Sequence, residues 1–193
     1  VIEWRLGTDE ADIELDVVRG GIELSVAVPK RAGETLGVEV QSAVFDRVRT
    51  CDNHCEFCFI YQLPKGMRKS LYLKDDDYRL SFRYGNFATL TNLKPRDTAR
   101  IIEYRLSPLY VSVHATDPVA RRYLLRNPLA PDILEQLRLF AAHGLEFHTQ
   151  VVMSPGVNDG PVLEQTLSDL CAFGRAVLSV SVVPVGLTTF SKH

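Results

Sequence analysis

The sequence lacks any long uninterrupted hydrophobic run. A membrane-spanning helix needs about 18 or more apolar residues in succession, and the richest stretch, residues 177–187, is broken by serines, a proline and a glycine. An excess of positive charge is also absent, because 22 lysines and arginines stand against 24 aspartates and glutamates. We therefore predict no membrane span, and no global electrostatic attraction to nucleic acid or to anionic membranes.

The sequence also lacks an initiator methionine and the charged-then-apolar pattern of a secretory signal. It starts within what looks like a strand, so we expect a fragment of a longer chain. Only four cysteines occur in 193 residues, and three of them lie between positions 51 and 58. Cysteines that close make poor disulfide partners, and a chain of this size needs no disulfide framework. A reducing, cytoplasmic setting is expected.

The first part of the chain has the pattern of a β-hairpin. Apolar and charged residues alternate over 13–17, Gly20-Gly21 supplies a tight turn, and the period of two continues over 22–28. A further short strand is expected over 36–40. We predict that residues 1–41 form a small β-rich domain and that residues 42–193 form a second domain.

From residue 42 onwards, strand patterns alternate with helix patterns. Strands are predicted over residues 42–48, 86–91, 109–115, 147–153 and 177–183. Helices are predicted over 95–106, 132–143 and 162–173, with Asp117-Pro118 capping another. Such alternation indicates an α/β fold with a parallel sheet and crossover helices, open or closed into a barrel.

Two of the predicted strands have one apolar and one polar face. In the stretch from Leu109 to Ala115, the side chains of Tyr110, Ser112 and His114 share one face, and the other face is apolar. The stretch that includes Gln150 repeats the arrangement. Parallel strands covered by helices are normally apolar on both faces. The polar face therefore predicts a lumen that holds a ligand near the carboxyl ends of the strands.

Three cysteines form a C-x3-C-x2-C run, Cys51, Cys55 and Cys58, directly after a predicted strand. Thiolates select soft metals, and three protein thiolates on a cluster with four irons leave one iron open to another molecule. The pattern favours an iron–sulfur cluster over the other possibilities, structural zinc completed by a histidine and unliganded thiols. The fourth cysteine, Cys171, is expected to be a small core residue on a helix.

The cysteine spacing, with Phe57 immediately before the last cysteine, resembles the signature of radical S-adenosylmethionine (SAM) enzymes. The neighbouring segments extend the resemblance over essentially the whole chain: residues 57–68, 70–72, 74–82, 84–87, 107–118, 148–152 and 155–160. They are similar to a bacterial subfamily with a PDZ-like amino-terminal domain, a radical-enzyme barrel and a carboxy-terminal domain of unknown function.

The resemblance implies a partial (β/α)6 TIM-like barrel over residues 42–193, truncated at its carboxy-terminal end, after a β-rich PDZ-like segment. It also implies an oxidoreductase-like enzyme that uses a [4Fe–4S] cluster to cleave SAM reductively. The resulting 5′-deoxyadenosyl radical would take hydrogen from an unknown substrate. The implied partners are an electron donor such as a flavodoxin or ferredoxin, and a peptide or protein at the PDZ-like domain.

The resemblance further implies a set of residues that bind the SAM cofactor. Phe57 would pack near the adenine, and Thr91 and Asn92 stand where the wider family often has a Gly-Gly-Glu motif that grips the cofactor amine. That motif is absent here, although Asn92 offers a carbonyl acceptor. The remaining implied contacts, to the ribose, carboxylate or adenine, come from Ser112, His114, Gln150 and Asn158.

Two plainer interpretations accompany these hypotheses. The metal site could merely brace a partner-binding module, with zinc or a redox-inert cluster. His114 and His148 fit hydrogen-bonded lumen residues as well as ligands, and residues 158–160 fit a turn and helix cap. The charged residues of 68–77, from Arg68 through Lys74 to Asp77, are expected to form a solvated surface without a role.

Overall fold

The computed structural model describes residues 11–34, 44 and 46–190. The chain divides into two compact units, residues 1–42 and residues 43–193. Among the described residues, no helix combines the length and the hydrophobicity needed to cross a membrane.

The first unit contains an antiparallel hairpin of β1 (Ile13–Arg19) and β2 (Ile22–Val28). Gly20 and Gly21 make the turn with φ of 61° and 84°, a left-handed conformation that favours glycine at both positions of a two-residue hairpin loop. The predicted hairpin is thereby confirmed. The strand predicted over 36–40 lies outside the described residues.

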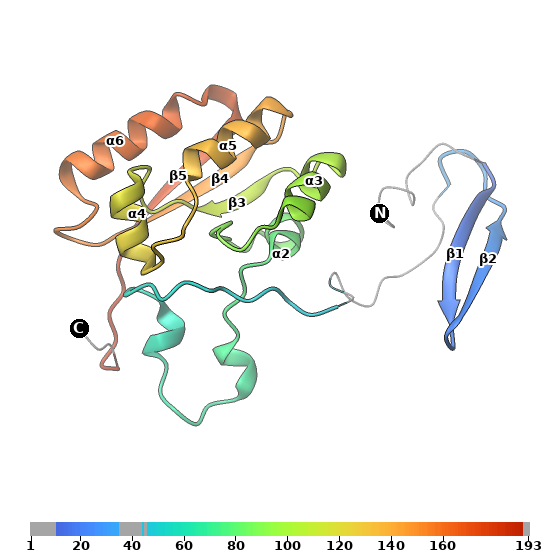
Figure 1. Ribbon diagram of the computed structural model, residues 1–193, viewed down its shortest axis with the longest axis horizontal. Coiled ribbons are helices and arrows are strands. Elements are labelled where there is room, and N and C mark those ends of the chain that lie inside the picture. Colours follow the sequence, from blue (N-terminus) through green and yellow to red (C-terminus); the bar gives the residue numbers. More distant parts are fainter. Residues whose placement is uncertain (1–10, 35–43, 45, 191–193) are drawn as a thin grey trace. The chain divides into compact units, whose positions relative to one another are not determined.

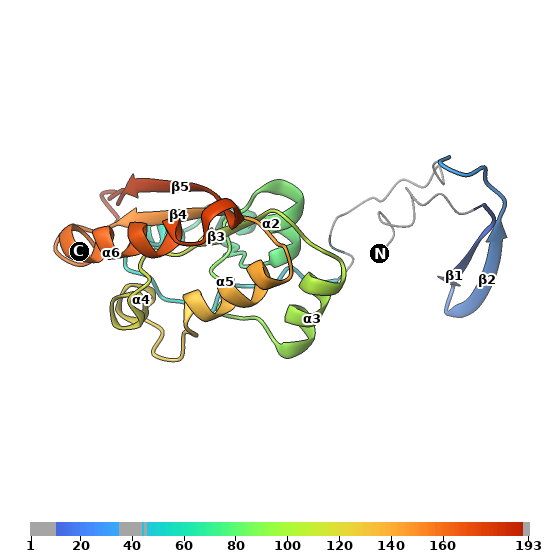
Figure 2. The same ribbon diagram turned by 90° about the horizontal axis from the view of Figure 1, so that it is seen from above.

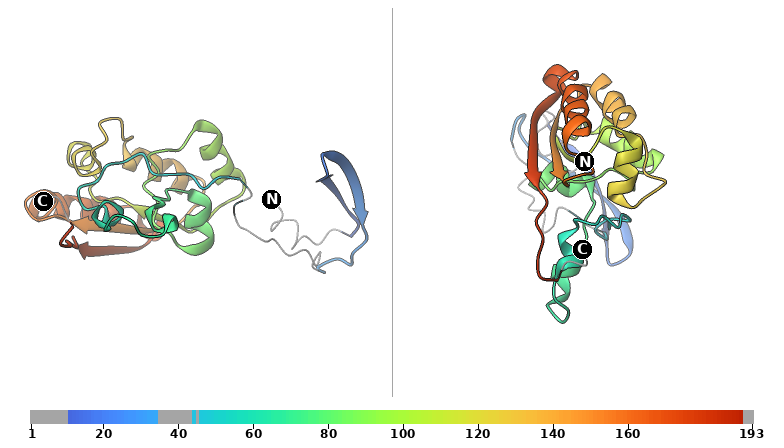
Figure 3. Two further views of the ribbon diagram at one scale, coloured as in Figure 1. Left: turned by 90° about the horizontal axis from the view of Figure 1, so that it is seen from below. Right: turned by 90° about the vertical axis from the view of Figure 1, so that its left-hand side faces the viewer.

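The second unit is built on a parallel sheet of three strands in the order β3-β4-β5. Crossover helices connect the strands and lie on one face of the sheet, as Figures 1, 2 and 3 show. The elements are β3 (Leu109–Ser112), α4 (Pro118–Leu125), α5 (Ile133–Ala142), β4 (Phe147–Met153), α6 (Gly160–Cys171) and β5 (Val177–Pro184). The sequence therefore predicted the mixed α/β class and these three strands, although the strand expected over 109–115 ends at Ser112, before His114.

The sheet does not close into a barrel over residues 44 and 46–190. The strand predicted over 86–91 is reduced to one parallel bridge between Ala88 and Val111, and residues 46–49 contain no strand. Side chains bond some of the backbone groups there. Arg121 bonds the carbonyl of Thr89 at 2.8 Å, and the carboxylate of Asp77 accepts from the amide of Arg49 at 2.9 Å. Such bonds replace the ladder of a regular strand.

Aspartates begin most of the helices that surround the sheet. Asp117 caps α4, as the sequence predicted, and Asp132 caps α5; both accept bonds from backbone amides of the first turn. The predicted helix at 95–106 is α3 (Pro95–Glu103), which ends earlier. A further helix, α2 (Tyr78–Tyr84), was not predicted and is capped by Asp77. The structure adds three short 3-10 helices, η1 (Phe59–Gln62), η2 (Lys69–Tyr72) and η3 (Gly174–Ala176).

The core of the second unit lies between the sheet and its helices. Leu109, Val111, Val113 and Ala115 are fully buried, which confirms the predicted apolar face of this stretch. Each large side chain buried in this way contributes roughly 1.5–3 kcal/mol. Cys171 is not in this core. It is exposed at the last residue of α6, so the prediction of a core cysteine is wrong: the helix turns that position toward solvent.

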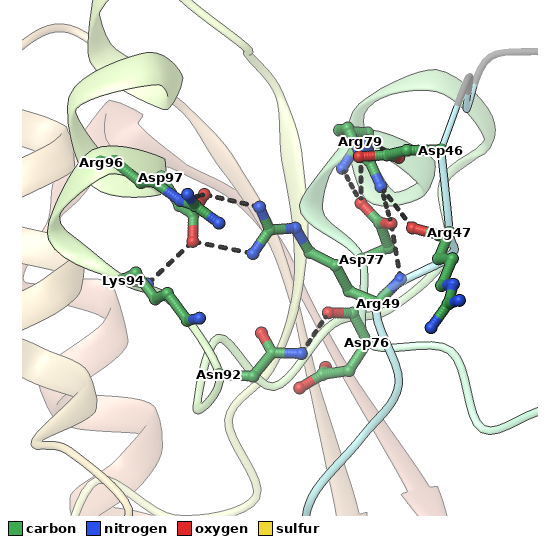
Figure 4. Close-up of polar contacts among 10 residues, drawn as sticks. All are labelled: Asp46, Arg47, Arg49, Asp76, Asp77, Arg79, Asn92, Lys94, Arg96 and Asp97. Carbon is green, nitrogen blue, oxygen red and sulfur yellow. Dashed lines mark hydrogen bonds and ion pairs between the residues drawn. The ribbon is translucent and has the colours of Figure 1, made fainter.

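A cluster of ion pairs fixes the chain just before the cysteines (Figure 4). Arg49 forms two hydrogen bonds with Asp97, at 2.7 and 2.6 Å. Arg79 bonds both carboxylate oxygens of Asp77 and one oxygen of Asp46. Burial raises the pKa of Asp77, but the hydrogen bonds from Arg79 and Arg49 outweigh it and hold that pKa below its usual value.

The expectation of a solvated charged surface over residues 68–77 is wrong for its last residues. Asp76 is 2% exposed and Asp77 is 1% exposed. Each accepts hydrogen bonds from groups distant in sequence, Thr89 for Asp76 and Arg49 for Asp77. A charged run has the same sequence pattern whether its side chains face solvent or distant partners. The burial of these two aspartates therefore depends on tertiary contacts.

Candidate metal centre and cofactor cavity

A cavity of about 470 Å³ lies beside the carboxyl ends of β3 and β4. This volume is within the range of small-molecule sites, about 300–1,000 Å³. Its wall includes all three clustered cysteines, Cys51, Cys55 and Cys58. The polar strand faces supply Ser112, His114 and Gln150 to the same wall. The two features that the sequence singled out separately therefore share one cavity.

Backbone hydrogen bonds hold the cysteine loop at several points. The amide of Cys51 donates to the carbonyl of Lys74 at 2.8 Å, and the amide of His54 donates to the carbonyl of Leu125 at 2.9 Å. Cys55 packs with Leu125 and the neighbouring Ala130 in a small hydrophobic cluster. The end of α4 thus provides the surface on which the loop is folded.

Burial makes the metal-free thiols of Cys51 and Cys55 weaker acids than usual. It raises the pKa of Cys55 to about 12, and the proximity of Cys51 and Cys58 adds to the effect. Burial also raises the pKa of Cys51, with a further contribution from the carboxylate of Asp76. Three thiolates in one buried loop repel each other, so they need a bound cation to remain deprotonated together.

The donor set fits an iron–sulfur cluster better than a single metal ion. Among the described residues, no three histidines, cysteines or acids are placed to hold one ion. A cubane cluster does not require this, since each thiolate binds a different iron. The Nδ1 atoms of His54 and His148 bond the hydroxyls of Tyr61 and Ser179 at 2.9 and 2.8 Å.

The side chain of Asn53 organises the loop from within. It is 1% exposed, and its amide nitrogen lies 3.3 Å from the sulfur of Cys51 and 2.9 Å from the hydroxyls of both Thr89 and Thr91. Its carbonyl oxygen accepts a bond of 2.8 Å from Asn127, beyond α4. A single side chain therefore connects the cysteine loop with two other segments of the chain.

Lys74 brings a positive charge to the cavity wall. Its ammonium group donates to the backbone carbonyl of Asn53 at 2.8 Å and to the hydroxyl of Tyr61 at 2.6 Å. Partial burial lowers the pKa of Lys74, but the Tyr61 bond and the charges of Cys51 and Cys58 raise it further, so the net shift is upward. The lysine remains charged beside the thiols.

His114 forms part of the cavity wall as a neutral ring. Burial, together with the nearby charge of Arg121, lowers its pKa to about 3. One ring nitrogen accepts a bond of 3.2 Å from the amide of Val152, and the ring packs at 4.7 Å from that of Phe57. The other ring nitrogen carries the proton and is a donor.

Arg121 is a buried cation that holds the strand ends. It is 1% exposed and bonds the carbonyls of Thr89, Ser112 and Val113. Burial lowers its pKa to about 10, against the opposing charges of Asp76, Cys55 and Asp132. It therefore stays protonated at neutral pH, and it brings the ends of two adjacent segments together below the cavity.

The structure places the predicted cofactor residues in two groups. Phe57, Ser112, His114 and Gln150 line the cavity, whereas Thr91, Asn92 and Asn158 do not. Thr91 bonds Asn53, and the amide of Asn92 bonds the carbonyls of Thr50 and Asp76. Asn158 bonds the backbones of Ser154, His114 and Val152. These three side chains therefore bond groups of the protein itself and not the interior of the cavity.

Sequence reasoning missed Asn53, Lys74 and Arg121. Asn53 carried a signal, because it lies inside the cysteine motif, where a side chain is close to sulfur. Lys74 was seen only as part of a charged run. Arg121 follows Asp117 by one helical turn, and nothing in its spacing distinguishes it from the exposed Arg122.

The site and the fold define a class: an α/β protein with a cysteine-lined cavity at the ends of parallel strands. Comparison with known families identifies it further. The Radical SAM-like domain family matches residues 30–180, and the chain belongs to this family. The match begins after the hairpin, so the PDZ-like domain stays a prediction, as does the carboxy-terminal domain. No curated protein matches the chain.

Proposed function

We propose that this protein is a radical SAM enzyme. Cys51, Cys55 and Cys58 hold a [4Fe–4S] cluster, and SAM binds in the adjoining cavity. The cluster supplies one electron that splits SAM into methionine and a 5′-deoxyadenosyl radical, which then takes a hydrogen atom from a substrate.

One observation carries the proposal. Three soft thiol donors and the polar face of two parallel strands line the same cavity. A structural zinc site has no need of such a cavity, because its ligands close around the metal. A cluster with three protein thiolates leaves one iron without a protein ligand, so it needs an adjoining space for a further molecule.

The residues of the cavity wall have complementary roles in this proposal. Phe57 offers an aromatic face to the adenine, and Ser112 and Gln150 offer hydrogen bonds to the ribose or the carboxylate. His114 donates a hydrogen bond from its protonated ring nitrogen. Because the ring stays neutral, it does not repel the positively charged sulfonium of SAM. Asn158 and Arg121 keep the strand ends in place.

The remaining parts of the proposal concern partners. The electron comes from a small redox protein such as a flavodoxin or ferredoxin, in the reducing environment of the cytoplasm. The first unit is a PDZ-like domain that binds a peptide or a protein. The hairpin of β1 and β2 is consistent with such a domain, whose ligands add to an exposed sheet edge.

Anaerobic reconstitution with iron and sulfide tests the proposal. The parent protein, Cys55→Ala and Cys171→Ala are compared for bound iron and sulfide, and for 5′-deoxyadenosine formed from SAM with dithionite. The parent and Cys171→Ala should bind four irons per chain and cleave SAM, because Cys171 is exposed and lies outside the cavity. Cys55→Ala should lose most of the iron and all of the cleavage.

Two results would contradict the proposal. One is a colourless parent protein with one zinc per chain, which would indicate the metal-braced binding module instead. The other is full iron binding and SAM cleavage in Cys55→Ala, which would show that the clustered thiols are not the ligands.

A further inference from the structure

We propose that Asn53 is a positioning residue of the metal centre and that, together with Lys74, it makes the cluster easier to reduce. This inference rests on the proposed function, because it concerns the cluster held by the three cysteines. It goes beyond that function by assigning the control of the reduction step to two side chains that are not ligands.

The geometry around Cys51 carries the first step. The side-chain amide of Asn53 lies 3.3 Å from the Cys51 sulfur. A hydrogen bond to a ligating sulfur withdraws negative charge from the cluster and so stabilises its reduced form. Asn53 is buried, and Asn127 fixes its carbonyl oxygen at 2.8 Å. The amide is therefore held with its donors toward the sulfur and the threonines.

The side-chain amide of Asn53 has more acceptors around it than hydrogens to donate. An amide NH2 group has two hydrogens, and three acceptors surround that of Asn53: the Cys51 sulfur and the hydroxyls of Thr89 and Thr91. A thiol is a weak acceptor, whereas a metal-bound thiolate carries negative charge and accepts more strongly. The N–H···S bond should therefore strengthen when the cysteine binds iron.

Lys74 acts on the same centre through charge. It donates to the backbone carbonyl of Asn53 at 2.8 Å, which fixes it to the loop, and it lines the same cavity as the three cysteines. Reduction adds one negative charge to a cluster with three thiolates. A cation at the cavity wall favours that addition, because attraction between opposite charges is strong where water is partly excluded.

The charges around Lys74 support this role. The acid closest to it in sequence, Asp75, bonds the amide of Asn86 at 2.8 Å, and Asp76 is turned inward onto Thr89. The ammonium donates its hydrogen bonds to a neutral carbonyl and a neutral hydroxyl. No carboxylate among the described residues forms an ion pair with Lys74, so its charge is not neutralised by an acid at the cavity wall that it shares with the cysteines.

Redox titration of the reconstituted protein, followed by electron paramagnetic resonance without SAM, tests the inference. Lys74→Met should lower the midpoint potential by about 59 mV, equivalent to about a tenfold shift of the one-electron equilibrium toward the oxidised cluster. Lys74→Arg should keep the parent potential because it keeps the charge. Lys69→Met removes the same charge from an exposed position of η2 and should also leave the potential unchanged.

Asn53→Ala provides a second, independent measurement. It should shift the potential in the same direction as Lys74→Met and alter the g-values of the reduced cluster, because it removes the bond to a ligating sulfur. If Asn53→Ala does not fold, the midpoint potentials of the lysine variants test the inference.

The outcomes separate the two proposals. A parent protein that takes up no iron would overturn both. A parent that binds a [4Fe–4S] cluster, with the same potential in Lys74→Met as in Lys69→Met, would overturn this inference and leave the proposed function standing.

Discussion

The side-chain amide of Asn158 donates a hydrogen bond of 2.7 Å to the backbone carbonyl of His114. It also bonds the carbonyl of Val152 at 2.9 Å and accepts from the amide of Ser154 at 2.7 Å. One fully buried side chain therefore ties the end of the β3 segment to the end of β4. His114 has a positive φ of 62°, so this contact also holds the cavity wall in an uncommon conformation.

Asn158→Ala should destabilise the protein substantially. It removes three hydrogen bonds and leaves buried backbone groups without partners, which should cost about 3 kcal/mol. Urea denaturation of the metal-free chain gives the measurement. Asn86→Ala is the control, because Asn86 is exposed and bonds only one side chain. Equal denaturation midpoints for the two variants would contradict the role given to Asn158.

Arg121 and Arg122 should respond very differently to replacement by lysine. Arg121→Lys leaves strand-end carbonyls in the interior without donors and should lower the free energy of unfolding by about 3 kcal/mol. Arg122 is exposed and bonds one carbonyl, that of Ala130 at 3.0 Å, so Arg122→Lys should cost about 0.5 kcal/mol or less. Urea denaturation of both variants compares them directly, and similar losses would refute the structural role of Arg121.

His114 should make stability depend on pH. Its pKa falls from 6.5 in the unfolded chain to about 3 in the folded one, mainly through burial. As the pH falls, this histidine therefore takes up a proton in the unfolded chain before it does so in the folded chain. Its neutral ring contributes fully to the free energy of unfolding above pH 6.5, and this contribution declines below that pH. Between pH 7 and pH 5 the loss should be about 2 kcal/mol.

His114→Gln removes that loss and should flatten the pH dependence between pH 7 and pH 5. Urea denaturation at the two pH values measures the effect, with His143→Gln, at an exposed position, as the control. A slope unchanged in His114→Gln would show that the ring is not held neutral in the folded chain.

Metal removal should reveal an order of thiol reactivity. In the metal-free chain Cys171 is exposed and should be alkylated first. The pKa of Cys55 is raised to about 12, so at pH 8 roughly one thiol in ten thousand is a reactive thiolate. Timed alkylation with iodoacetamide and peptide mass spectrometry give the rates. Alkylation of Cys55 as fast as Cys171 would contradict the buried position of its sulfur.

Local patterns predicted the hairpin and the three parallel strands because both depend on short-range periodicity. The alternation of Leu109, Val111 and Val113 with polar residues shows which face is buried, and a cap such as Asp132 marks a helix start without knowledge of its neighbours. Two predicted strands are absent from the described residues for a different reason. The residues at 46–49 and 86–91 have strand-like sequences, but distant side chains take up their backbone groups.

The sequence by itself determined the donor chemistry: three thiols in a short loop, and a polar face on two strands, because residue type and spacing are local properties. The tertiary structure alone decided which groups surround those thiols. Asn53 and Lys74 reach the centre from the loop and from a charged run, whereas Arg121 holds the strand ends from α4. Hydrogen bonding and burial between segments distant along the chain depend on how the whole unit packs, and no local pattern records that packing.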